Sequence, residues 1–391
     1  MGLTGVLDAR NRQDILDRLA GQTFDVLVIG GGVTGAGAAL DAASRGLRVA
    51  LVESRDLASG TSSRSSKLIH GGLRYLEQLD FKLVREALKE RDLLVSRLAP
   101  HLVKPVTFLY PLRRKVVEQP FVAAGLTLYD ALEGMRRPMP RHRSLPVKEA
   151  RRLAPGLRAD ALTGAMIYYD AQVDDARFTL ALARTAAAHG AVIATRTSAV
   201  RMLRDERGER IVGAGVRDEE TGREIEVGAD AVVVCAGVWT DLVSELPGGA
   251  EPGFKVRMSK GVHVLVPGEA IQSRTGMIIR TEKSVLFIIP WTSRRWIIGT
   301  TDTDYDGERA EPAATGQDID YILEHANSVL ARPLTRDDVV GLYVGLRPLV
   351  AADQSSATTK LSREHVVDVP MPGLATIAGG STPPTGSWPR T

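Results

Sequence analysis

Residues 24–54 read FDVLVIGGGVTGAGAALDAASRGLRVALVES. This stretch begins with an apolar run, breaks at glycines, continues as an alanine-rich segment and returns to a second apolar run. Short apolar runs on either side of a helix-length segment are typical of buried parallel strands joined by a crossover helix. The stretch therefore predicts a βαβ unit.

Three glycines follow the first predicted strand directly. Gly30, Gly32 and Gly35 form the pattern GxGxxG, and Glu53 ends the second predicted strand. The glycines permit a tight turn and a close approach of the backbone to a pyrophosphate, which the helix N-terminus stabilises. An acid at the end of the second strand accepts a hydrogen bond from a ribose hydroxyl. We therefore expect a dinucleotide site here, the alternative being a glycine turn without a ligand.

The acidic residue suits the adenosine ribose of either NAD or FAD, so this motif alone does not choose between them. The chain leaves the βαβ unit for a polar stretch, SSRSSKLIHGGLRYLE (62–77), and returns to it much later with VVVCAGVWTD and GLYVGLRPLV. Long loops inside compact domains are usually functional or disordered. A second GxGxxG is missing from the sequence. We therefore do not expect a separate NAD site, and electrons would leave to another acceptor.

The remaining segments divide into two kinds. Residues 81–98, 168–203 and 229–243 contain helix-period or strand-then-helix patterns, with Gly190 closing one helix. Residues 262–304 alternate or run as strands without intervening helices, which indicates an antiparallel sheet. The N-terminal stretch to residue 23 has the pattern of a short amphipathic helix. At 391 residues the chain exceeds the size of one core, so two domains are expected.

Composition restricts the class of protein. Hydrophobic residues make up 44% of the chain and charged residues 25%, and no apolar run approaches the length that spans a bilayer. The N-terminus lacks the pattern of a signal peptide. The single cysteine, Cys235, excludes internal disulfides and cysteine-based zinc or iron–sulfur sites, which fits a reducing compartment. We therefore expect a cytoplasmic protein without a metal, and no nucleic-acid-binding module is recognisable.

The charge is unevenly distributed. The net charge is +3, but residues 104–152 contain eleven Lys or Arg against four acids. The basic segments LRRK (112–115) and RRPMPRHR (136–143) flank a predicted apolar helix, FVAAGLTLYDAL. Such a pattern suits contact with an anionic membrane surface. The alternative is a solvated basic surface over a core helix.

Seven motifs resemble, in order and spacing, the FAD-dependent glycerol-3-phosphate dehydrogenases. They are GGGVTGAGAALDAASRG, SSKLIHGGLRYLE, YYDAQVDDAR, KGVHVLVP, IIGTTDTD, GLRPL and TKLSREHVV, and they extend from about Phe24 to Gly380. SSKLIHGGLRYLE is quite specific to that family, whereas GxGxxG and GLRP occur in many flavin oxidases of the amino-acid oxidase type. The resemblance implies a peripheral membrane enzyme that oxidises glycerol 3-phosphate to dihydroxyacetone phosphate and passes electrons from FAD to a quinone. A homodimer is an open possibility.

The fold class implied is α/β. An FAD-binding, Rossmann-like domain of the glutathione-reductase or amino-acid-oxidase type would be combined with a mostly antiparallel β substrate domain, and a C-terminal helical domain would be missing. We expect an N-terminal helix in 1–23, a discontinuous FAD-binding domain in 24–100, 155–255 and 342–380, and a substrate domain in 101–154 and 256–341.

The resemblance also implies roles for the substrate residues. Arg74 and Tyr75 of the polar stretch, with Arg363 of KLSREH, would bind the substrate, mainly its phosphate. Arg347 would lie over the flavin near the reacting carbon. His263 of KGVHV would be the catalytic base, since imidazole titrates near neutral pH. The alternative for His263 is a buried histidine satisfied within the sheet.

The polar stretch is expected to bind the flavin through hydroxyls and backbone N–H groups, and Gly71 and Gly72 would let the backbone pass close to the ring. Arg64 would point away as an ordinary solvated arginine, while Asp174 and Asp175 would cap a helix. The expected cofactor-binding residues are Gly30, Gly32, Gly35, Glu53, Thr61, Ser62, Ser66, Lys67, Leu68, His70, Gly237 and Gly345.

The chain departs from the family pattern after Gly380. The family continues with a sequence such as Lys-Tyr-Thr-Thr-Tyr-Arg-Val-Met-Ala-Lys-Asp, whereas residues 381–391 read STPPTGSWPRT. Codons for the family sequence, with one A deleted from the first, encode this tail. We therefore hypothesise a frameshift after Gly380, which resequencing of the gene tests. Because an active-site lysine is expected where Ser381 stands, the printed chain should bind FAD poorly and show little or no activity.

Two other functions stay open at this point. An oxidase of the same fold would pass electrons to oxygen and produce peroxide, and a non-catalytic flavin-binding fragment would not oxidise a substrate.

Overall fold

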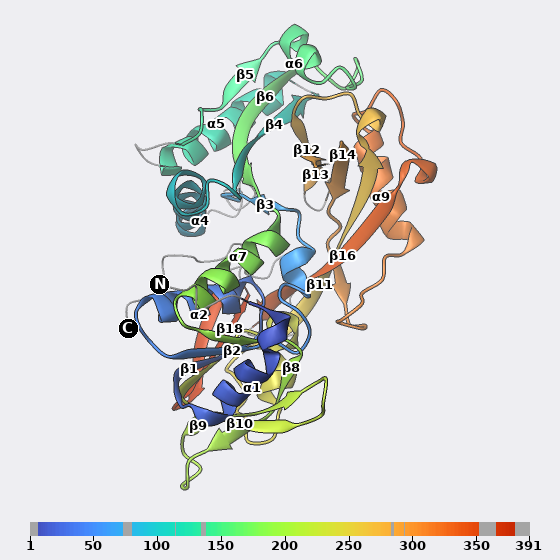
Figure 1. The fold of residues 1–391 in the computed structure, drawn as a ribbon. Helices are drawn as coiled ribbons and strands as arrows, with labels where there is room; N and C mark the ends of the chain where they lie inside the picture. Colours follow the sequence, from blue (N-terminus) through green and yellow to red (C-terminus); the bar gives the residue numbers. More distant parts are fainter. Residues whose placement is uncertain are drawn as a thin grey trace.

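The computed structural model describes residues 7–72, 80–113, 115–133, 138–282, 285–292, 294–351 and 365–379. In these residues the chain forms two sheets, one in the lower and one in the upper part of Figure 1. The long paired strands β11 (Lys255–Pro267) and β16 (Gly341–Ala351) belong to the upper sheet and reach down toward the lower one.

The first sheet has the strand order β17-β18-β10-β1-β2-β7, and β9 and β8 are attached through β10. β1 pairs in parallel with β10 and with β2, which confirms the predicted βαβ unit. The bounds are β1 (Phe24–Ile29), β2 (Val49–Val52), β7 (Val192–Ala194), β8 (Thr197–Arg204), β9 (Ile211–Asp218), β10 (Glu224–Val234), β17 (His365–Met371) and β18 (Leu374–Gly379).

Helices cover this sheet on both faces. Alanines of α2 (Val33–Ser44) and α7 (Asp175–Ala188) pack together with Val28 of β1 on one face. Leu16 and Leu19 of α1 (Arg12–Gly21) pack on the other face, against the neighbouring side chains of β1. Because successive side chains of a strand point to opposite faces, the uninterrupted apolar run of β1 serves both layers.

The second sheet has the order β15-β11-β14-β13-β12-β4-β6-β3, with β16 paired to β11 and β5 to β6. β11, β12, β13 and β14 pair antiparallel, which confirms the antiparallel sheet predicted for 262–304. The other bounds are β3 (Leu68–Ile69), β4 (Lys104–Leu112), β5 (Arg143–Leu145), β6 (Gly164–Gln172), β12 (Gly276–Arg280), β13 (Val285–Trp291), β14 (Arg295–Gly299) and β15 (Thr303–Tyr305).

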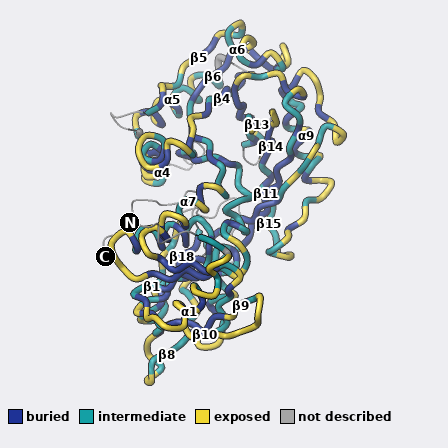
Figure 2. Tube along the Cα trace, viewed as in Figure 1, coloured by how far each residue is buried: buried dark blue, intermediate teal, exposed yellow. Residues whose placement is uncertain are grey.

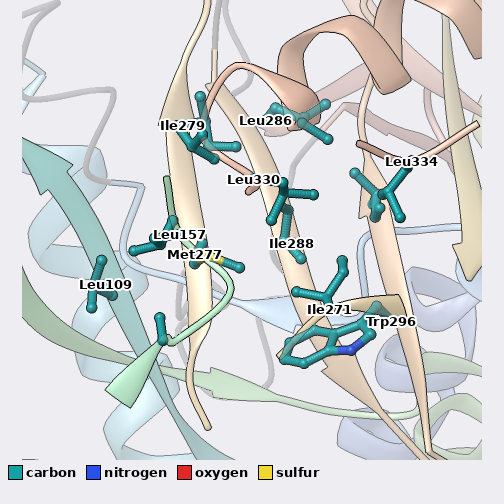
Figure 3. Close-up of a cluster of buried hydrophobic side chains, with 14 of the residues drawn as sticks. Leu109, Leu157, Ile271, Met277, Ile279, Leu286, Ile288, Trp296, Leu330 and Leu334 are labelled. Atoms are coloured by element: carbon teal, nitrogen blue, oxygen red, sulfur yellow. The ribbon is translucent and has the colours of Figure 1, made fainter. Parts of the chain in front are cut away.

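The core of this part lies between the sheet and α9 (Gly316–Asn327), whose N-terminus is closed by a capping box of Thr315 and Asp318. Figure 3 shows side chains of β12 and β13, among them Met277 and Ile288, facing Leu330 and Leu334 from the segment after α9. The other helices here are α4 (Phe81–Leu93), α5 (Lys115–Glu133) and α6 (Val147–Leu153), with a π-helical turn, η3 (Leu94–Leu98), after α4.

Short helical turns occupy several loops. They are η1 (Ala9–Asn11), η2 (Thr61–Ser63), η4 (Gly237–Trp239), η5 (Gly268–Ala270), η6 (Arg336–Asp338) and the short helix α8 (Thr240–Ser244).

Sheet membership differs from the predicted domain ranges at several strands. β3 lies within 24–100, β6 within 155–255 and all of β16 except Gly341 within 342–380, which are ranges expected to form the FAD-binding domain. All three strands pair in the second sheet. The reason is strand pairing, since β3 and β4 pair with β6 and β16 pairs with β11 along its whole length. The polar stretch is also not entirely a loop, because Leu68 and Ile69 form β3.

The strands of both sheets are largely buried, and the exposed residues gather on outer helix faces and loops (Figure 2). Within the described residues, no helix is both long and apolar enough to cross a membrane.

Candidate active site

The turn between β1 and α2 requires glycine. Gly30 has φ +115°, and a Cβ there would lie 2.5 Å from the carbonyl oxygen of Cys235 on the neighbouring chain segment. A Cβ at Gly35 would collide with the carbonyl oxygen of Gly30. The first turn of α2 therefore packs directly on the β1 turn, as a close approach of backbone to a pyrophosphate demands.

The N-terminus of α2 is available to an anion. Its N-cap residue is Gly32, which has no side chain to cap the first N–H groups. The Val33 N–H donates to Ser62 Oγ at 2.9 Å, so the polar stretch reaches the helix end. A helix N-terminus whose own N-cap residue is glycine, beside a serine hydroxyl, fits the diphosphate of a dinucleotide.

Glu53 supports the same turn. One carboxylate oxygen accepts from the Gly31 N–H at 2.7 Å, and the other accepts from the Arg55 N–H at 2.8 Å. The carboxylate thus lies at the carboxyl end of β2, beside the glycines. Its predicted bond to a ribose stays a prediction.

Residues 63–67 of the polar stretch are fixed to the start of α7. The Lys67 ammonium contacts Asp175 and donates to the Ser63 carbonyl oxygen at 2.5 Å. The Ser65 hydroxyl donates to the second Asp175 oxygen at 2.6 Å. Lys67 has φ +60°, a backbone conformation that side chains rarely adopt. These bonds therefore hold the strained residue in place.

The structure gives Lys67 and Asp175 partners that the sequence did not predict. Lys67 was expected along the flavin, and its ammonium is buried in an ion pair with Asp175. Asp174 caps α7 by accepting from the Arg177 N–H, which confirms its predicted role. Asp175, also predicted at this helix end, accepts from the Ala176 N–H at 3.0 Å and in addition binds Ser65 and Lys67 of the polar stretch. Arg64 is not simply solvated, because it donates to the Ala310 carbonyl oxygen at 2.9 Å.

His263 meets the polar stretch from β11. Its Nε2 lies 2.8 Å from Ser66 Oγ, and its ring stacks on Tyr343 of β16 at 4.8 Å between centroids. The side chain is 2% exposed, and its Nδ1 has no hydrogen-bond partner among the described residues. Burial, followed by the positive charges of Arg347 and Lys67, lowers the pKa of His263 to about 3. The imidazole is therefore neutral, buried and only half satisfied.

Arg347 lies on β16, four residues after Tyr343. Its guanidinium donates to Thr300 Oγ1 at 3.0 Å and to the Thr301 carbonyl oxygen at 3.3 Å. A Cβ at Gly261, two residues along β11 from Ser259, the strand partner of Arg347, would lie 2.7 Å from Arg347 Nη2. The guanidinium is thus held over the backbone of β11, near His263.

Other predicted cofactor residues border the same region. Thr61 Oγ1 donates to the Leu346 carbonyl oxygen at 2.6 Å, and the His70 ring lies 6.5 Å from that of Phe287. Gly345 lets β16 touch the polar stretch, because a Cβ there would collide with the Arg64 carbonyl oxygen. Gly237 has φ +57° at the start of η4. Leu68 begins β3.

Three predicted substrate residues, Arg74, Tyr75 and Arg363, lie outside the described residues. Sequence reasoning missed Tyr343, which stacks on His263 and donates to the Ser65 carbonyl oxygen at 2.9 Å. The signal was present in GLYVGLRP, since Tyr343 is two residues before Gly345 and pairs across the strands with His263. The described residues contain no cluster of metal-ligating side chains.

Known proteins are similar to this chain over most of its length. The FAD dependent oxidoreductase family matches residues 25–386. Glycerol-3-phosphate dehydrogenase 2 of Mycobacterium tuberculosis is 58% identical over 364 residues, which are 93% of this chain and 61% of the relative. Glycerol-3-phosphate dehydrogenase of Mycobacterium leprae is 56% identical over 375 residues, 96% of this chain and 63% of the relative.

A solved structure has the same fold. The glycerol-3-phosphate dehydrogenase from Bacillus halodurans complexed with FAD superimposes with a TM-score of 0.75 at 32% identity, covering 96% of this chain and 64% of the other. The chain therefore spans a little over 60% of the length of the relatives it matches.

Proposed function

Because the chain belongs to the FAD dependent oxidoreductase family, we propose that it oxidises sn-glycerol 3-phosphate to dihydroxyacetone phosphate, as part of an FAD-dependent dehydrogenase. The names of its Mycobacterium and Bacillus relatives support this substrate. One structural observation carries the proposal. A neutral, buried His263 with an unpartnered Nδ1 lies between the polar stretch and Arg347.

The residues present fit FAD. Gly30, Gly32 and the α2 N-terminus would hold its diphosphate, with Ser62 beside them, and Glu53 would accept from its ribose. When bound, FAD supplies the acceptor for the hydride that leaves the secondary alcohol carbon. The chain itself has to bind the substrate, orient that carbon and take the hydroxyl proton.

His263 is suited to take the proton. In the tautomer in which Nε2 donates to Ser66 Oγ, Nδ1 carries the lone pair that accepts. A pKa of about 3 ensures the neutral form but makes the ring a weak base. A phosphate dianion near the ring would raise the pKa of His263, since an opposite charge favours the protonated form. Substrate binding would thus strengthen the base.

Arginine side chains would hold the negative charges of the substrate. Arg347 is fixed by Thr300 and Thr301, so its planar guanidinium can stabilise the charge that develops on the substrate oxygen. Arg74, Tyr75 and Arg363 would bind the phosphate, for which the arginine fork provides two parallel hydrogen bonds. The roles of Arg74, Tyr75 and Arg363 are proposed from the sequence motifs alone.

We infer a quinone as the electron acceptor, since the sequence has a single dinucleotide motif. Contact with an anionic membrane surface would bring the enzyme to the quinone. Phe121 and Leu128 support this idea, because they are exposed and seven residues apart on one face of α5, which follows a basic segment.

A steady-state assay tests the function and the acceptor. The protein, with the reading frame restored after Gly380, should reduce a soluble quinone analogue when glycerol 3-phosphate is added, and vesicles of anionic lipid should raise the rate with a lipid-embedded quinone. Glycerol, which lacks the phosphate, is the matched control. Peroxide formation in air without quinone would show that the protein is an oxidase and not a quinone-dependent dehydrogenase. Absence of any turnover with glycerol 3-phosphate would reject the substrate.

A further inference from the structure

The Gly71 N–H belongs to a chain of buried hydrogen bonds, here called the polar chain, which the proposed chemistry does not use. It donates to the hydroxyl of Tyr129 on α5 at 2.8 Å and lies 3.4 Å from an oxygen of Asp170 on β6. The Tyr129 hydroxyl donates to the same Asp170 oxygen at 2.7 Å. Arg91 of α4 donates to that oxygen at 2.9 Å and to the Tyr169 carbonyl oxygen at 3.3 Å.

The direction of these bonds is fixed. Burial raises the pKa of Tyr129 well above its ordinary value, and the negative charge of Asp170 raises it further. The phenol therefore keeps its proton and donates it to the carboxylate, so its oxygen is left to accept from Gly71. Arg91, Tyr129 and Asp170 are all at least 98% buried, so water does not compete for these bonds.

Gly71 also fits this chain sterically. A Cβ at that position would lie 2.6 Å from the Tyr129 oxygen and would collide with Leu88 of α4. The backbone at Gly71 is therefore pressed against the side chains of two helices. Both its hydrogen bond and its packing fix where the polar stretch leaves β3.

Stability alone is a poor explanation for the charged pair. Taking an arginine and a carboxylate out of water costs so much that apolar residues of similar size are often as stabilising. Val84 and Leu88 already provide apolar packing around Tyr129. What the polar chain adds is one defined position for the Gly71 peptide, since the bonds are directional.

We propose that Arg91, Asp170 and Tyr129 are positioning residues, which hold the segment His70–Gly72 so that the residues following it can bind the substrate phosphate. This inference rests on the proposed function, because Arg74 and Tyr75 follow Gly71 in the sequence. None of the three side chains is assigned a contact with substrate or cofactor. They act through the Gly71 peptide.

The test variant is Tyr129→Phe, which removes one hydroxyl and keeps the ring. In kinetics of the frame-restored holoenzyme, the KM for glycerol 3-phosphate should rise about tenfold, while kcat stays within about twofold and FAD content is unchanged. A purely structural role would lower the active fraction and hence kcat, but would not raise KM. Tyr168→Phe is the matched control, because Tyr168 is an equally buried tyrosine whose ring packs on Phe108.

Hydrogen exchange measures the chain independently of activity. The peptide containing Gly71 should exchange at least tenfold faster in Tyr129→Phe than in the unmodified protein or in Tyr168→Phe. Unchanged exchange in Tyr129→Phe would refute the claim that the Tyr129 hydroxyl holds the Gly71 peptide in place. Faster exchange with an unchanged KM would refute the positioning role. If the unmodified protein does not oxidise glycerol 3-phosphate, the proposed function fails, and the exchange rates alone still decide whether Tyr129 holds Gly71.

Discussion

At the residue scale, the site depends on a histidine whose environment suppresses its charge. His263 is surrounded by Ser66, the Tyr343 ring and the two nearby cations Arg347 and Lys67. A histidine satisfied within the sheet was the alternative interpretation of the sequence. The buried, unpartnered Nδ1 disagrees with full satisfaction.

The lowered pKa of His263 predicts a dependence of stability on pH. An exposed histidine titrates near about 6.5, whereas folding lowers the pKa of this one to about 3. Between these values the unfolded chain binds a proton that the folded protein does not, so the free energy of unfolding falls as the pH decreases from about 6.5. Above about pH 7 both states are neutral, and the contribution is constant.

Thermal unfolding measures this effect. His263→Gln should flatten the decline of Tm between about pH 6.5 and pH 4, because it removes the group that takes up the proton. His189→Gln, at the exposed end of α7, controls for replacing a histidine. An unaltered slope in His263→Gln would show that the ring is not held neutral by the fold.

The sequence predicted the position of a residue well where the residue type of a motif is required by local backbone geometry. GxGxxG was sufficient to predict the turn at Gly30 and Gly35, because only glycine fits that geometry. It was not sufficient to predict the ion pair between the Lys67 ammonium and Asp175, which lies 108 residues further along the chain. Such a partner depends on tertiary structure, which residue type and spacing do not encode.

At the scale of elements, the polar stretch and α7 behave as one unit. Asp175 binds both Ser65 and Lys67, and the Lys67 carbonyl oxygen accepts from the Val173 N–H at 3.0 Å. The first residue of α7 thus sets the path of the segment that contains Ser66. From sequence alone, an aspartate at a helix N-terminus is interpreted as a capping residue, because acidic residues are favoured at that position.

Asp175→Asn tests this coupling. Loss of the carboxylate leaves the buried Lys67 ammonium without its counter-charge, so the segment should loosen and the Kd for FAD should rise about tenfold, or about 1.4 kcal/mol. The measurement is fluorescence titration of the apoprotein with FAD. Asp174→Asn is the matched control, because asparagine caps a helix as well as aspartate does. Equal FAD affinity in both variants would contradict the role given to Asp175.

Element types were predicted better than element partners. The βαβ unit and the antiparallel strands of 262–304 follow from apolar periodicity, and both are confirmed. The partners of β6 and β16 were not predictable, since a buried apolar strand suits either sheet. Both strands join the second sheet through pairs that are distant in sequence.

At the scale of the whole molecule, the site forms where the two sheets approach each other. The first sheet contributes the dinucleotide turn, and β11 and β16 of the second bring His263 and Arg347 to the polar stretch that leaves the first. This arrangement brings together predicted site residues from both sheets, since Gly30 follows β1 and Gly345 lies on β16. It also explains why the residues of the site are scattered through the sequence.

Anaerobic titration of the FAD-loaded protein with glycerol 3-phosphate, followed by flavin absorbance, measures whether the protein oxidises this substrate. The frame-restored protein should bleach on adding glycerol 3-phosphate and not on adding glycerol, while the printed chain should bleach little. His263→Gln, with its FAD retained, should bleach at least about a hundredfold more slowly, the usual minimum for loss of a general base. A frame-restored protein that holds FAD and keeps its oxidised spectrum in excess glycerol 3-phosphate would contradict the account.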